Sequence, residues 1–165
     1  MFDEAGENEL LLAALMQLGA KGGSIGAAAG GAATGTHGLG RAGARGGARG
    51  AARGFRWTKK DVSTTLVELS GTVTAVFQLV RTTLADLGNP LGVEARDNGG
   101  IAVRAMVGVG IGGLNPTVVT AVVAAGPEGV AVVELRAAGR EGLIKQHPAE
   151  KALAKITTQL KAASQ

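Results

Sequence analysis

The sequence predicts an α+β fold over residues 61–165, with an antiparallel sheet of four to five strands and two helices packed on one face. Two observations predict it. Short β-branched stretches with alternating polarity are separated by turns rich in Gly, Pro and Asn, and two longer segments carry apolar residues at helical spacing. The expected order is β-α-β-β-β-β-α. Hairpin connections keep successive strands adjacent, and each helix has one apolar stripe to bury against the sheet.

The first half of this domain contains one strand, one helix and one hairpin. Polarity alternates over residues 63–69, which are rich in β-branched residues, and this predicts a strand. From Val73 to Leu87 apolar residues recur at helical spacing, with Ser70 or Thr72 as the N-cap and Gly88 as the end. Residues 91–96 and 101–109 predict two strands around Asp97-Asn98-Gly99, a sequence typical of tight hairpin turns.

The second half repeats the hairpin and ends in a helix. Residues 117–124 and 130–138 predict strands joined by the turn Gly126-Pro127-Glu128-Gly129. Pro148 suits the first position of a helix, because its missing N–H has no partner there in any case. One face of this helix is apolar and consists of Ala149, Ala152, Leu153, Ile156 and Leu160.

Residues 1–18 predict a short helix with an acidic start and an apolar face, which Gly19 ends. The charge before the apolar run is negative, which argues against a signal peptide. The run is also too short to span a bilayer, so no transmembrane segment is expected.

Residues 19–60 form a low-complexity segment rich in Gly, Ala and Arg, predicted to be a linker or an assembly segment. Glycine costs about 1 kcal/mol per helical position relative to Ala, which favours a linker without regular structure. Small residues every four positions instead favour close packing of helices. The candidate self-association residues are Leu11, Leu12, Leu15, Leu18, Gly22, Gly26 and Gly30.

The net charge of +4 arises in the N-terminal segment, because residues 10–60 carry eight basic residues and no acidic one. Arginine recurs every four residues from Arg41 to Arg53, and aromatic and basic residues follow. In a helix this spacing places the arginines on one face as a basic stripe. In an extended chain it makes a flexible polycation. The candidate contacts to an anionic surface or nucleic acid are Arg41, Arg45, Arg49, Arg53, Arg56, Trp57, Lys59 and Lys60.

No catalytic, cofactor or metal site is predicted. The chain has no Cys, which excludes thiolate nucleophiles and disulfides. The glycines of residues 108–113 precede a strand rather than a helix, so they do not form a dinucleotide-binding fingerprint. His37 and His147 are the only histidines, and no pair of residues has metal-ligand spacing.

The element order, with a long helix after the meander, resembles a small helix-grip domain of the Bet v 1/START type, and also one half of the TATA-binding-protein fold. The likeness covers residues 63–163. Short bacterial domains of unknown function share a phrase similar to Gly71-Thr72-Val73-Thr74-Ala75-Val76-Phe77. The helix-grip resemblance implies that an apolar ligand is held between the sheet and the C-terminal helix.

The expected function is therefore a non-catalytic binding or assembly module. Its basic N-terminal segment contacts an anionic surface or neighbouring subunits. A carrier of a small apolar ligand and a protein that binds RNA or DNA through the Arg-rich segment remain as alternatives. The expected partners are a second copy or another protein, nucleic acid or an anionic membrane surface. The expected location is the cytoplasm, including the periphery of a membrane.

Overall fold

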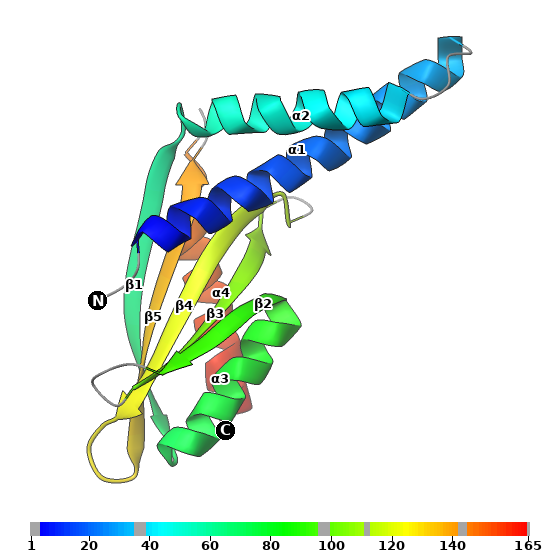
Figure 1. Cartoon of the computed structure of the whole chain (residues 1–165). Coiled ribbons are helices and arrows are strands. Elements are labelled where there is room, and N and C mark those ends of the chain that lie inside the picture. Colours follow the sequence, from blue (N-terminus) through cyan, green and yellow to red (C-terminus); the bar gives the residue numbers. More distant parts are fainter. Residues whose placement is uncertain (1–3, 35–38, 96–99, 111–112, 142–144, 165) are drawn as a thin grey trace. The chain divides into compact units, whose positions relative to one another are not determined.

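A computed structural model describes residues 4–34, 39–95, 100–110, 113–141 and 145–164 (Figure 1). The chain divides into two compact units, Met1–Lys59 and Lys60–Gln165. The first is a helical hairpin and the second is the α+β domain.

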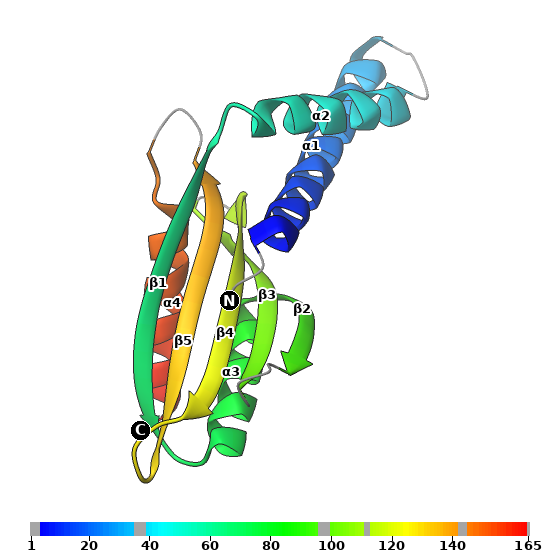
Figure 2. The ribbon, with the colours of Figure 1, turned by 60° about the vertical axis from the view of Figure 1, so that its left-hand side comes forward.

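The hairpin consists of α1 (Glu4–Thr34) and α2 (Leu39–Phe55), which lie side by side in Figures 1 and 2. The expectation of a helix that ends at Gly19, followed by a linker, is wrong, because helix covers most of the segment. The reason is a contact that only glycine permits. A Cβ added to Gly19 would lie 2.5 Å from the carbonyl oxygen of Gly47 and 2.8 Å from Cβ of Ala51. Close packing of the two backbones compensates for the low helix propensity of glycine.

The glycines that make this contact within the chain differ from the candidate self-association glycines. Gly19 and Gly23 of α1 pack against Gly43 and Gly47 of α2. By contrast, no heavy atom lies within 4 Å of a Cβ built on Gly22, Gly26 or Gly30. Within the chain, the helix–helix contact therefore uses the neighbouring face of α1.

By length and composition alone, α1 is able to cross a membrane. The segment Gly6–Ala33 has 28 residues, and its most apolar window has a mean hydropathy of 1.3. The apolar run was expected to be too short to span a bilayer because the helix was expected to end at Gly19. Because α1 continues past that residue, the apolar segment is longer than expected.

The second unit contains a five-stranded sheet in the order β1-β5-β4-β3-β2. Strands β2 to β5 form a meander of antiparallel neighbours. The elements are β1 (Lys59–Ser70), α3 (Val73–Leu87), β2 (Gly88–Ala95), β3 (Ile101–Val109), β4 (Asn115–Ala125), β5 (Val130–Glu141) and α4 (Pro148–Ala163).

The predicted elements of this domain are confirmed; β3 has the predicted bounds, and the other strands begin or end a few residues beyond theirs. Thr72 is the N-cap of α3, since its side chain accepts a hydrogen bond from the N–H of Ala75 at 3.2 Å. The predicted turn at residues 97–99 lies outside the described residues.

Helices α3 and α4 lie on one face of the sheet (Figure 2). Alternate residues of the strands point toward them, and the interior is filled by Val, Ala and Leu side chains. The α4 residues at its centre, Ile156 and Leu160, are fully buried. The strands contribute Val67, Leu69, Val103, Ala105, Val107, Val109, Val119, Ala121, Val123, Ala131, Val133, Leu135 and Ala137 to this core.

Candidate functional site

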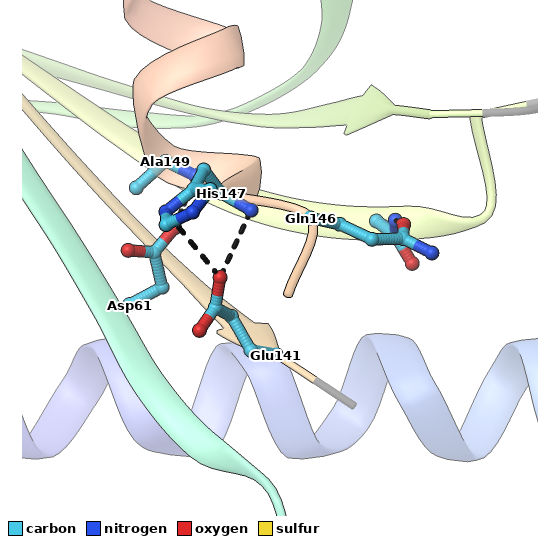
Figure 3. A network of polar contacts seen from close by, with 6 residues as sticks. Asp61, Glu141, Gln146, His147 and Ala149 are labelled. Atoms are coloured by element: carbon cyan, nitrogen blue, oxygen red, sulfur yellow. Dashed lines mark hydrogen bonds and ion pairs between the residues drawn. The ribbon is translucent and has the colours of Figure 1, made fainter. Parts of the chain in front are cut away.

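A polar cluster lies at the N-terminus of α4, where three elements meet (Figure 3). Asp61 comes from the start of β1, Glu141 is the last residue of β5, and His147 immediately precedes α4. A carboxylate oxygen of each acid and a ring nitrogen of His147 all lie within 4.8 Å of one another. Two carboxylates and one imidazole therefore converge from residues that are far apart in the sequence.

Backbone hydrogen bonds hold the two carboxylates in place. The N–H of Ala149, in the first turn of α4, donates to Oδ2 of Asp61 at 2.8 Å. The N–H of His147 donates to Oε1 of Glu141 at 2.9 Å. These amides belong to the end of a helix, where N–H groups have no partner within the helix and the dipole attracts negative charge. The two acids thus cap α4 from two different strands.

His147 contacts Glu141 through its side chain as well, with Nδ1 3.6 Å from Oε1 (Figure 3). Its backbone is left-handed, with φ of 48°, and its side chain does not cap the helix. Beside it, Asn115 donates a hydrogen bond to Gln146.

Gly139 allows α4 to approach β5 closely at this end of the sheet. A Cβ added there would lie 2.9 Å from Cγ of Pro148 and 3.2 Å from the hydroxyl oxygen of Thr117. Thr117 is fully buried, and its hydroxyl has no hydrogen-bond partner among the described residues. Burying a hydroxyl without a hydrogen-bond partner costs folding free energy, so Thr117 is an unusual polar residue at this end of the sheet.

Sequence reasoning missed this cluster because the search relied on spacing along the chain. The signal that could have found it is strand alternation. The core residues of β1 and β5 are all odd-numbered, and so are Asp61 and Glu141. Side chains two positions apart point to the same face of a strand, so both acids share the face of the core residues. Both acids are therefore polar residues at positions that face the helices.

A groove of about 450 Å³ lies between β1 and α4. Its lining mixes hydroxyl, charged and apolar side chains. The members are Ser63, Thr64, Thr65, Glu150, Leu153, Ala154, Thr157, Thr158 and Lys161. Its volume falls within the range of sites for small molecules, and its lining suits an amphiphilic ligand better than a wholly apolar one.

The predicted anion-binding residues lie mostly on α2. Arg41, Arg45, Arg49 and Arg53 are all exposed, and their spacing places them along one face of the helix. The glycines that pack on α1 fall on the opposite face, since α2 makes 3.6 residues per turn. Helix α2 is therefore basic on one side and closely packed on the other. After it, Arg56, Trp57 and Lys59 are exposed, Trp57 by 86%, and Lys60 is partly buried.

The predicted self-association residues all lie on α1. Leu11 is buried, and Leu12, Leu15 and Leu18 are partly buried. Gly22, Gly26 and Gly30 are exposed. Their role in contacts between copies stays a prediction.

No protein-family model and no curated protein matches this chain. Similar solved structures include a START superfamily protein from Mycobacterium smegmatis, which is 6% identical and has a TM-score of 0.40 over 63% of this chain and 97% of that one. A truncated norcoclaurine synthase from Thalictrum flavum is 12% identical, with a TM-score of 0.35 over 64% and 94%. An uncharacterized protein from Bacillus thuringiensis is 16% identical, with a TM-score of 0.38 over 62% and 96%.

The element order and strand order of the second unit support the helix-grip resemblance expected from the sequence.

Proposed function

We propose that this chain is a non-catalytic binding protein of the helix-grip type, attached to an anionic membrane surface by its basic helical hairpin. The observation that carries the attachment is the exposed stripe of four arginines on α2. No acidic residue lies between positions 10 and 60, so this charge is not neutralised from within the segment. Each basic residue near an anionic leaflet contributes about 1 kcal/mol of attraction.

A lipid surface suits this hairpin better than nucleic acid because the hairpin is apolar as well as basic. By length and composition, helix α1 is long and apolar enough to cross a membrane. Three of the hairpin's large apolar side chains are exposed, Met16 by 36%, Ile25 by 70% and Leu39 by 43%. Binding to phosphates alone needs only the cations, whereas an interfacial helix pair gains from burying apolar side chains in lipid. Arginine stems also pack on apolar surface while the charged heads reach phosphate groups.

Sedimentation with lipid vesicles tests the attachment. We expect the full chain to bind vesicles that contain phosphatidylserine and to bind neutral phosphatidylcholine vesicles at least tenfold more weakly. Replacing Arg41, Arg45, Arg49 and Arg53 by Gln should abolish this preference, because glutamine keeps the length and the helix propensity but not the charge. Equal binding to both kinds of vesicle would contradict the proposal. Preferential binding to single-stranded RNA, with a steep salt dependence, would favour the nucleic-acid alternative.

A second candidate function, that of a small-ligand carrier, is favoured by the groove between β1 and α4. Helix-grip proteins, by resemblance, hold their ligands between the sheet and the C-terminal helix. Here the interior beneath α4 is filled by core side chains such as Ile156 and Leu160. The proposed ligand therefore lies in the outer groove, where Lys161 and the hydroxyls of Thr157 and Thr158 orient a polar head and Leu153 contacts an apolar body.

A fluorescent amphiphile, anilinonaphthalene sulfonate, tests the carrier function. We expect saturable binding to the wild-type chain that Ala154→Trp weakens at least tenfold, because the indole fills the groove. Ala162→Trp is the matched control, since Ala162 is exposed on the same helix and does not line the groove. The same affinity in wild type and in Ala154→Trp would place the dye elsewhere and refute the groove as the ligand site.

A further inference from the structure

We propose that Asp61, Glu141 and His147 form a binding site for a divalent transition-metal cation, with zinc as the best-suited ion. The three side chains come from β1, from the end of β5 and from the residue before α4 (Figure 3). All three contribute ligand atoms within 4.8 Å of one another. Oxygen and imidazole nitrogen are the ligand types that a zinc site uses when no thiolate is present.

The separation of the ligand atoms is close to that of an occupied site. Zinc–ligand bonds of about 2.0–2.2 Å in tetrahedral geometry place any two ligand atoms about 3.4 Å apart. Nδ1 of His147 lies 3.6 Å from Oε1 of Glu141, which already matches this value. Asp61 completes the set at no more than 4.8 Å, so a small side-chain rotation brings all three to the bonding distance.

Backbone amides already position the carboxylates, as the outer shell of a metal site does. Oδ2 of Asp61 accepts from the N–H of Ala149, and Oε1 of Glu141 accepts from the N–H of His147. A carboxylate oxygen has two lone pairs, so Oε1 of Glu141 accepts this hydrogen bond and keeps a lone pair for an ion. Outer hydrogen bonds of this kind fix the orientation of ligands and reduce the entropy lost when the ion binds.

The electrostatics of the cluster also favour a cation. Two carboxylates whose oxygens lie within 4.8 Å of each other repel, and the helix dipole offsets only about half an elementary charge. A divalent ion neutralises both acids while neutral His147 adds a third ligand.

The buried hydroxyl of Thr117 is a separate observation at the same end of the sheet. A Cβ built on Gly139 would lie 3.2 Å from this hydroxyl and 2.9 Å from Cγ of Pro148, the residue after His147. The hydroxyl has no hydrogen-bond partner among the described residues. Three protein ligands leave one tetrahedral position for water. This end of the sheet thus carries the three ligands and, close to Gly139, a buried hydroxyl without a partner among the described residues.

A bound ion would also link β1, the first strand of the domain, to the start of α4, its last helix, and so stabilise the folded state. Asp61 and His147 are at opposite ends of the domain sequence. An ion that binds the folded state and not the unfolded state raises the melting temperature in a concentration-dependent way. Thermal unfolding therefore provides a readout that is independent of any activity.

Calorimetric titration of the full chain with zinc chloride tests the proposal. We expect one site per chain, and at least tenfold weaker binding for Asp61→Asn, Glu141→Gln and His147→Ala. Asn and Gln keep an oxygen that accepts the backbone N–H, so a purely capping role survives these substitutions while a metal site does not. Glu150→Gln, at an exposed position in the first turn of α4, and His37→Ala, at the only other histidine, should bind zinc like the wild type.

The melting temperature should rise with zinc in the wild type and in both controls, and not in the three cluster variants. Circular dichroism of each variant without metal verifies that it is folded. No saturable binding to the wild type would overturn the proposal. Unchanged binding in folded His147→Ala and Asp61→Asn would do so as well, because the ion would then lie elsewhere.

Discussion

At the scale of single residues, glycine shows how the same residue has opposite effects at positions three residues apart. Gly19 and Gly22 both lie in α1. A side chain on Gly19 would collide with Gly47 and Ala51 of α2, whereas one on Gly22 meets nothing within 4 Å. The sequence pattern alone presents both as glycines in a small-residue repeat, and only the packing separates them.

This difference predicts opposite effects of the same substitution. Gly22→Ala should stabilise the hairpin by up to about 1 kcal/mol, through helix propensity alone. Gly47→Ala should destabilise it despite the same gain, because the new Cβ would overlap the carbonyl oxygen of Gly19 and force the helices apart. Hydrogen exchange of the α1 and α2 amides measures both changes. Equal protection in the two variants would show that the close glycine contact does not stabilise the hairpin.

At the scale of elements, the α+β domain was predictable because its local signals agree with its tertiary structure. The alternation of β3 and β5 and the helical apolar spacing of α3 and α4 all match the faces that are buried. Thr72 and Pro148 also mark the starts of their helices as expected. Consistency between propensity, pattern and burial is what makes such elements readable from one sequence.

The two N-terminal helices were not predictable in the same way, since their stability comes from a contact between segments rather than from either segment. Intrinsic propensity counts each glycine as unfavourable. Propensity contains no term for the contact between helices, in which Gly19 and Gly23 pack against Gly43 and Gly47 and allow the two backbones to approach closely. Gly22, Gly26 and Gly30, the candidates for self-association, have the same spacing of four and take no part in this contact within the chain.

At the scale of the whole molecule, charge and chemistry are divided between the two units. The basic surplus lies in residues 1–60, while residues 61–165 carry equal numbers of acidic and basic residues. The cluster of Asp61, Glu141 and His147 belongs to the second unit and required the fold to be seen, because no spacing in the sequence joins residues 61, 141 and 147. The arginine stripe was visible in the sequence, and the structure added the helix that aligns it.

The central claim is that the arginines of α2 attach the chain to an anionic membrane, and a stepwise series of variants tests it most directly. One, two, three and then all four of Arg41, Arg45, Arg49 and Arg53 are replaced by Gln, and partitioning onto phosphatidylserine vesicles is measured at low salt. We expect each step to lose about 1 kcal/mol, a roughly fivefold drop in the partition coefficient, so that its logarithm falls linearly with the number of arginines removed. A partition coefficient that stays constant through the whole series would contradict the account.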